Sequence, residues 1–172
     1  MVKTWVISDL HLGHENVCTK FTREDGSPLR PFACADEMDR ALIDNWNSVV
    51  SPQDRVYVLG DVVMRKQHLY KFDQMVGRKV LVKGNHDIFE AKEYLKYFDD
   101  LRSYVVKKTK EGGKLIMSHI PVHPESLGRF GLNIHGHLHA NNLSDSRYVN
   151  VSVEQTNYFP IELEEAIKRG RV

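Results

Sequence analysis

Residues that can bind a metal or move a proton follow five short apolar runs of the chain. The five polar groups are Asp9-x-His11, Gly60-Asp61, Gly84-Asn85-His86-Asp87, Ser118-His119 and Gly136-His137-Leu138-His139. Any one group alone is typical of a solvated loop. Together they supply carboxylate, imidazole and amide donors, which suit divalent transition metals such as Mn, Fe, Co, Ni or Zn. Because no donor is a cysteine, the set excludes a structural zinc site of the cysteine type.

The number of donors favours more than one metal ion. The candidate ligands are Asp9, His11, Asp61, Asn85, His119, His137 and His139. Seven donors are too many for one tetrahedral ion, but they fit two ions that share a bridging carboxylate. His123 competes with His119 for one position, and the Ser-His-x-Pro context favours His119.

The elements that must position these donors alternate between strand and helix in the first half of the chain. The predicted strands are 4–8, 55–60 and 79–84, and the predicted helices are 36–50 and 64–76. Strand–helix–strand repetition favours a parallel α/β sheet, in which the carboxyl ends of the strands lie along one edge. We therefore expect the polar groups to converge at that edge.

The spacing within two of the groups supports this convergence. Asp9 and His11 are two residues apart, and so are His137 and His139. In an extended chain residues i and i+2 point to the same side, so each pair would present both donors together. The leucine inside each pair would point the other way, into the core.

The second half of the chain predicts shorter and partly antiparallel elements. Residues 101–119 predict a β-hairpin that turns at Gly112-Gly113. A phosphate-binding loop is the alternative for this Gly-Gly-Lys, but the required spacing and the following Ser or Thr are missing. The remaining predicted elements are a long loop at 18–33, strands within 131–137 and 147–153, and a C-terminal helix over 160–170. We expect one domain over 1–172.

The motifs DLH, GD, GNHD, SH and GHLH occur in this order over residues 9–139 and resemble the calcineurin-like metallophosphoesterases. The stretches SDLHLGHENV and FACADEMDRALIDNWN are similar to the small bacterial and phage branch, whose members often read SDTHFGHxNI. The resemblance implies an αββα sandwich of two packed, mixed β-sheets flanked by helices. At 172 residues the chain is near the minimum length of that family, so accessory substrate-selecting elements should be reduced.

The resemblance also implies a role for each donor. Metal one would be held by Asp9, His11, Asp61 and His139, and metal two by Asp61, Asn85, His119 and His137. Asp61 would bridge the two ions. His86 would face the phosphate without binding a metal, as an acid or an electrostatic aid. The implied activity is hydrolysis of a phosphomonoester or phosphodiester by hydroxide activated between two divalent ions, with manganese as our first choice.

Several neighbouring residues are candidates for supporting roles. His14, Asn16, Arg23 and Arg30 lie on loops beside the donors and could contact substrate, although solvated surface is the commoner fate of such arginines. Asp87 could orient His86 or cap a following helix, and His135 could support His137 or belong to the core.

Composition limits the partners and the compartment. The chain is 41% hydrophobic and 27% charged with a net charge of +1, so a long nucleic acid is not expected. We expect a small phosphorylated substrate, a nucleotide among the candidates. No apolar run approaches the roughly 18 residues of a membrane span, and no signal peptide is evident. The two cysteines, Cys18 and Cys34, are expected to be free thiols in a cytoplasmic protein. The oligomeric state stays open.

Two other functions remain as alternatives. The first is a nuclease-type phosphodiesterase acting on short nucleic acid ends, which the neutral net charge does not exclude. The second is a non-catalytic scaffold for protein interactions on the same fold. Such a scaffold would be expected to lose ligands or His86, whereas this chain keeps all of them.

Overall fold

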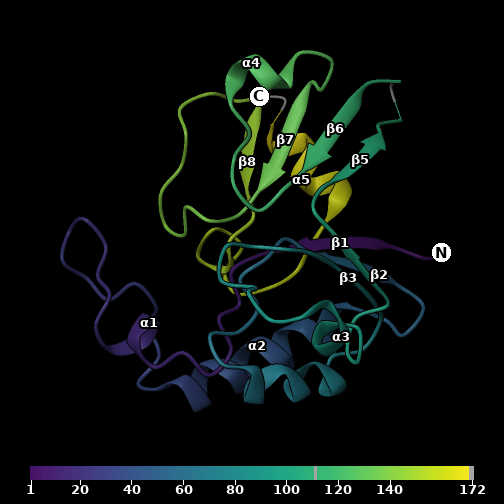
Figure 1. Cartoon of the computed structure of the whole chain (residues 1–172). Coiled ribbons are helices and arrows are strands. Elements are labelled where there is room, and N and C mark those ends of the chain that lie inside the picture. Colours follow the sequence, from purple (N-terminus) through teal and green to yellow (C-terminus); the bar gives the residue numbers. More distant parts are fainter. Residues whose placement is uncertain (111, 171–172) are drawn as a thin grey trace.

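Two mixed β-sheets pack face to face and form the centre of the molecule (Figure 1). The computed structural model describes residues 1–110 and 112–170. The first sheet has the order β4-β3-β2-β1-β9, in which β9 is antiparallel to β1 and the other neighbours are parallel. Its strands are β1 (Thr4–Ile7), β2 (Arg55–Val58), β3 (Arg78–Val82), β4 (Asp100–Arg102) and β9 (Ile161–Glu162).

The second sheet has the order β5-β6-β7-β8. Its strands are β5 (Val105–Lys108), β6 (Lys114–Met117), β7 (Leu132–His135) and β8 (Tyr148–Asn150). Strands β5 and β6 form the predicted antiparallel hairpin, and β6, β7 and β8 run parallel. The carboxyl ends of β1, β2, β3, β6 and β7 therefore precede the five polar groups, as the sequence predicted.

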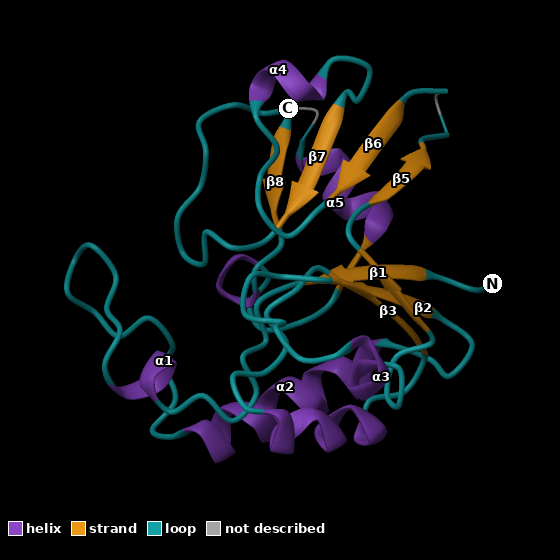
Figure 2. Ribbon diagram, viewed as in Figure 1, coloured by secondary structure: helices purple, strands orange, loops and turns teal. Residues whose placement is uncertain are grey.

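Helices cover the face of the first sheet that points away from the second sheet (Figure 2). They are α2 (Ala35–Val49), the 3₁₀ helix η1 (Lys66–Gln74) and the short α3 (Ala91–Tyr94). Helix α2 buries Met38, Leu42 and Trp46, which follow the helical period, and it carries Asp36 and Glu37 in its first turn, where the helix dipole favours acids. The structure thus has the predicted αββα layers, although the outer layer over the second sheet is thin and contains the short helix α4 (Pro124–Leu127).

Alternating side chains of the central strands fill two separate cores. In β2, Val56 and Val58 pack towards the helices, whereas Tyr57 packs between the sheets. Because both faces of these strands are buried, they appear in the sequence as continuous apolar runs. The core between the sheets also contains Leu163 and Ile167 of α5 (Leu163–Arg169), which contacts strands of both sheets.

Three predicted elements differ from the structure. The C-terminal helix begins at Leu163 and not at Pro160, because residues 161–162 pair with β1 as β9. The segment 64–76 forms a 3₁₀ helix over Lys66–Gln74. The first strand of the predicted hairpin is divided: β4 pairs with β3, and after Ser103 and Tyr104 the chain enters the other sheet as β5.

Candidate metal centre

The loops that follow β1 and β2 continue side by side beyond the sheet. The amide of Asp9 donates to the carbonyl of Gly60 at 3.1 Å, and the amide of His11 donates to the carbonyl of Asp61 at 3.0 Å. The loop after β7 joins them, because the amide of His137 donates to Oδ2 of Asp9 at 2.9 Å. Three loops from two sheets therefore meet at one edge of the sandwich.

Five of the predicted ligands have a left-handed backbone. Asp9, His11, Asp61, His137 and His139 have φ values of 60°, 48°, 52°, 70° and 49°. Such values are uncommon outside glycine and persist only where surrounding structure imposes them, typically at functional sites. The donors at i and i+2 thus face the same cluster, but not through the extended conformation that the spacing suggested. Of the two intervening leucines, which were both predicted to enter the core, Leu10 is buried there, whereas Leu138 is only half-buried.

Glycines before the donors allow this close approach. A Cβ atom on Gly84 would lie 2.3 Å from Oδ1 of Asp61, and one on Gly136 would lie 1.9 Å from the hydroxyl of Ser8 and 2.4 Å from Oδ2 of Asp9. Neither position has room for a side chain unless the loops move apart. The Gly-Asn-His-Asp and Gly-His-Leu-His motifs therefore begin with glycine because a larger side chain would clash with Asp61 or with Ser8 and Asp9.

Gly136→Ala should consequently disrupt the centre, while Gly131→Ala should not. A methyl group at Gly131 would meet nothing closer than 3.9 Å, and neither glycine has a positive φ. We expect Gly136→Ala to lower the free energy of unfolding by about 1–3 kcal/mol, as overpacking does, and to weaken metal binding. Thermal unfolding and metal titration of both variants measure this, and equal behaviour of the two would contradict it.

A first cluster of donors surrounds Asp9. Its Oδ1 lies 3.8 Å from Nε2 of His11 and 3.8 Å from Nε2 of His139. One donor atom from each of these three residues lies within 4.8 Å of the others, a spacing that can hold a metal ion. Oδ1 of Asp9 and both ring nitrogens of His11 are buried without a hydrogen-bond partner among the described residues. Buried polar atoms are almost always paired, so Oδ1 of Asp9 and Nε2 of His11, which face each other, fit a metal as their partner.

A second cluster lies on the other side of Asp61. Oδ2 of Asp61 lies 3.6 Å from Nε2 of His11 and 3.4 Å from Nε2 of His119. Oδ1 of Asn85 lies 2.9 Å from Nε2 of His119 and 3.0 Å from Nδ1 of His137. All seven predicted ligands therefore lie in one continuous group. Asp9 also forms a metal-compatible trio with Asp61 and His119, so both carboxylates touch both clusters.

The pKa shifts of His11 and Asp61 favour the protonation states in which these two side chains bind a metal. Burial and the nearby Arg30 guanidinium lower the pKa of His11 well below its usual value, which keeps the imidazole neutral. Burial raises the pKa of Asp61, but hydrogen bonding and charge from His119 and the amide of His86 outweigh it and leave the pKa lowered. Metals bind neutral imidazole and ionised carboxylate, so both protonation states suit a metal centre.

Comparison with known proteins identifies the family. The family model for calcineurin-like phosphoesterases matches residues 2–166. The chain belongs to this family. An uncharacterised protein, MJ1445, of Methanocaldococcus jannaschii is 34% identical over all of this chain and 95% of its own length. A protein of unknown function, AQ665, of Aquifex aeolicus has a solved structure with a TM-score of 0.75 and 28% identity over 98% of this chain and 99% of that chain. The gene 66 protein of Mycobacterium phage L5 is 34% identical over 51% of this chain and 41% of its own length.

Membership of the calcineurin-like phosphoesterases supports metal-dependent hydrolysis of a phosphoester in general. Members of this family typically bind divalent metals, and two groups of Asp and His among the described residues have a spacing that could hold a metal ion. In the part of the chain that the structure describes, no helix is both long and apolar enough to cross a membrane. Cys18 and Cys34 are free thiols, as expected.

Glu154 contacts the candidate metal centre, although no sequence motif marks it. Its Oε1 lies 3.0 Å from Nδ1 of His139 and 2.8 Å from Nε of Arg30. Burial would raise the pKa of Glu154, but Arg30 and His139 lower it to about 2, so the carboxylate is ionised. A carboxylate on the second ring nitrogen orients a ligating histidine through its tautomer. The only signal was that Glu154, like the predicted ligands, follows a short strand.

Arg30 does not contact the substrate position, which corrects the prediction. Its side chain is completely buried beneath the donors. Besides its ion pair with Glu154, it donates to the carbonyls of Asp9 and Leu10 at 2.5 and 2.8 Å. Arg30 thus holds the loop after β1 in its left-handed conformation and is unavailable as a phosphate clamp.

Replacing Glu154 with glutamine should weaken the centre and the fold together. Glutamine keeps the shape but removes the charge that faces Arg30, and breaking a buried ion pair costs about 3–5 kcal/mol. Loss of such a support for a ligand typically costs about 10–100-fold in metal affinity or activity. Glu165→Gln is the control, because its pair with Arg169 is exposed and should matter little. Metal titration and chemical denaturation measure both effects. Equal metal affinity and equal stability of Glu154→Gln and Glu165→Gln would contradict the supporting role of Glu154.

Asp87 differs from what was expected of it, whereas His135 is buried, as one of its two alternatives expected. The carboxylate of Asp87 accepts from the amides of Asp61, Val62 and Gly84 at 2.8, 3.1 and 2.7 Å. It therefore ties the loops after β2 and β3 together, and neither orients the His86 ring nor caps a helix. His135 is buried with Nδ1 2.8 Å from the carbonyl of Gly136, beside the His137 loop.

Of the remaining substrate candidates, Arg23 lines a hollow beside the centre, and His14 and Asn16 lie outside the lining of that hollow. The half-buried ring of His14 lies 5.6 Å from that of His11 and 5.8 Å from that of Phe21. Asn16 begins the short helix α1 (Asn16–Thr19) and is half-buried. Arg23 lines a hollow of about 330 Å³ together with His137 and His139. The long loop therefore reaches the donors through residues 22–24.

Proposed function

We propose that the chain hydrolyses a phosphomonoester or phosphodiester of a small substrate at a centre of two divalent metal ions. The observation that supports this most directly is the position of Asp61. One oxygen of its carboxylate lies 3.6 Å from a ring nitrogen of His11 and 3.4 Å from one of His119, residues of two different donor clusters. A carboxylate that lies between two groups of ligands is well placed to bridge two metal ions.

The division of ligands would follow from this bridge. Asp9, His11 and His139 would hold one ion, and Asn85, His119 and His137 the other, with Asp61 shared. Two such ions, when bound, neutralise phosphate oxygens and lower the pKa of water towards about 7. Manganese is our first choice, and Fe, Zn, Ni and Co suit the same oxygen and nitrogen donors.

His86 would act on the substrate and not on the metal. Its side chain is exposed at the edge of the donor group, with its ring 5.8 Å from that of His11. Its amide donates to Oδ1 of Asp61 at 2.9 Å, which fixes the backbone beside the bridge while the ring stays free. From there the imidazolium would stabilise the developing charge or give its proton to the leaving oxygen.

A small substrate fits the surroundings of the centre. The adjoining hollow of about 330 Å³ is at the lower end of the range for small-molecule pockets. Arg23 on its wall would contact the phosphate or the leaving group. A nucleotide is one candidate, and short nucleic acid ends are the alternative.

A hydrolysis panel tests the proposal. p-Nitrophenyl phosphate, bis-p-nitrophenyl phosphate and cyclic nucleotides would each be offered with each of the five metals. We expect the chain to hydrolyse at least one of these substrates. This hydrolysis should need metal, stop on chelation and be absent from a matched Asp61→Asn preparation. Absence of hydrolysis with every metal at full loading would reject the enzymatic function and favour the scaffold. Equal rates in the Asp61→Asn preparation would assign the activity to a contaminant.

A further inference from the structure

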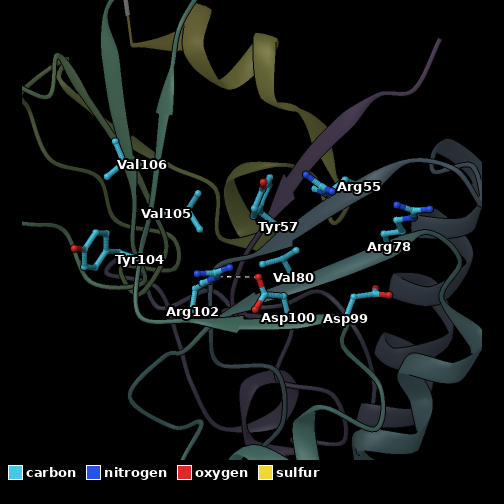
Figure 3. A pocket seen from close by; sticks show the side chains of 10 residues that line it. All are labelled: Arg55, Tyr57, Arg78, Val80, Asp99, Asp100, Arg102, Tyr104, Val105 and Val106. Carbon is cyan, nitrogen blue, oxygen red and sulfur yellow. Dashed lines mark hydrogen bonds and ion pairs between the residues drawn. The ribbon is translucent and has the colours of Figure 1, made fainter.

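A cleft of about 730 Å³ lies between the two sheets and is lined by residues of β2, β3, β4 and β5 (Figure 3). Its floor contains Arg55 and Tyr57 of β2 and Arg78 and Val80 of β3, and the edge strand β5, with Tyr104 before it, forms a wall. Arg55 opens β2, whereas Asp61 follows the end of that strand, six residues or about 20 Å of extended chain away. The end of the cleft that contains Arg55 is therefore remote from the proposed catalytic site.

Two arginines lie next to each other on the floor of this cleft. Arg55 and Arg78 are register partners in the parallel pair β2–β3, so both side chains leave the same face of the sheet. Like charges directly opposite each other in a sheet are destabilising. Neither guanidinium has a hydrogen bond or ion pair with any residue that the structure describes. Their backbones are fixed, since both amides donate to neighbouring carbonyls, at 3.0 and 2.8 Å.

The acids of the cleft are engaged elsewhere. Asp99 accepts from the amide of Lys79 at 2.7 Å. Asp100 pairs with Arg102 at 2.7 Å, as the dashed line in Figure 3 shows. Arg55 contributes to lowering the pKa of Asp100, but only after Arg102 and the nearby amide. Neither carboxylate forms an ion pair with Arg55 or Arg78 in the part of the chain that the structure describes, so both guanidinium groups are available to an external anion.

The rest of the cleft suits an organic group. Val80 and Tyr57 continue the floor beyond the two arginines, and Val105 faces them from β5 (Figure 3). The volume is within the range of small-molecule pockets and is much larger than a bare phosphate needs. Two guanidinium forks on a rigid strand pair match the oxygens of a phosphate.

We propose that this cleft is a second binding site, for a phosphorylated small molecule whose phosphate lies between Arg55 and Arg78. The organic part lies along Tyr57, Val80 and Val105. Ligand binding here is non-covalent and independent of the metals. The site goes beyond the proposed hydrolysis and does not depend on it.

Nuclear magnetic resonance of the zinc-loaded full chain tests the site residue by residue. AMP is the probe, with inorganic phosphate in a separate titration. We expect saturable shifts of the side-chain Nε–H signals of Arg55 and Arg78 and of the amides of Tyr57 and Val80. AMP should bind more tightly than phosphate. Arg55→Gln and Arg78→Gln should each weaken AMP binding about tenfold, as loss of a charged hydrogen bond does. Arg129→Gln, on an exposed arginine outside the cleft, should change nothing.

Each outcome of these titrations either supports or overturns the second binding site. Shifts confined to residues of the metal centre, or absent at about 10 mM AMP, would overturn the second site. AMP binding no tighter than inorganic phosphate would overturn the assignment of the organic part. Unchanged binding after chelation of the metal would support independence from the catalytic centre. Because Arg55 and Arg78 are exposed, their glutamine variants should fold, and matching amide spectra would verify this.

Discussion

Asp61→Asn should remove metal and activity together. The substitution keeps the side-chain shape, so Oδ1 can still accept from the amide of His86. It removes the negative charge that lies between His11 and His119. If the carboxylate bridges two ions, neither ion keeps its full set of ligands. We expect activity to fall by about 10³-fold or more, which corresponds to about 4 kcal/mol in the barrier.

Elemental analysis and metal titration of Asp61→Asn check this expectation. The wild type should hold two ions per chain, and the variant should hold fewer or bind them more weakly. Asp145→Asn is the matched control, because its half-buried carboxylate lies outside the donor group and, among the described residues, pairs with Arg147. Two ions retained at wild-type affinity would show that the bridge is elsewhere. Asp9 would then be the first candidate, since it belongs to both metal-compatible trios.

The convergence of the donors could be predicted from sequence, because it depends on topology. Parallel strands place their carboxyl ends together, and the apolar runs before Asp9, Asp61 and Asn85 mark three of those ends. The backbone conformation at these positions could not be predicted. Left-handed φ is normally signalled by glycine, whereas here it occurs at aspartate and histidine, where contacts distant in sequence impose it.

The supports of the centre could not be predicted for the same reason. Arg30 and Glu154 are 124 residues apart and carry no motif, yet they form the buried ion pair under His139. In sequence, Arg30 resembles any basic loop residue, and only burial distinguishes a structural arginine from a phosphate clamp. The division of the predicted hairpin strand into β4 and β5 likewise depends on which sheet offers a free edge, which no local pattern encodes.

His86→Ala should keep both metals and lose rate. The His86 ring lies 5.8 Å from the His11 ring, and its amide donates to Oδ1 of Asp61, whereas the ring forms no hydrogen bond with any donor in the described part of the chain. Alanine retains that amide, so the metal ligands should stay in place. General acid catalysis typically contributes about 10²–10⁴-fold, and we expect a loss in this range. The metal content of the variant tests whether both ions are kept, and its kcat/KM tests whether the rate falls.

The leaving group separates the roles that His86 could have. p-Nitrophenolate departs with little need of a proton, whereas an alkoxide needs one. If His86 is a general acid, the variant should lose more rate on alkyl phosphates than on p-nitrophenyl phosphate. Equal losses on both substrates would make His86 an electrostatic clamp for the phosphate. Loss of metal from His86→Ala would make it a ligand, and the assignment of seven ligands without it would then be wrong.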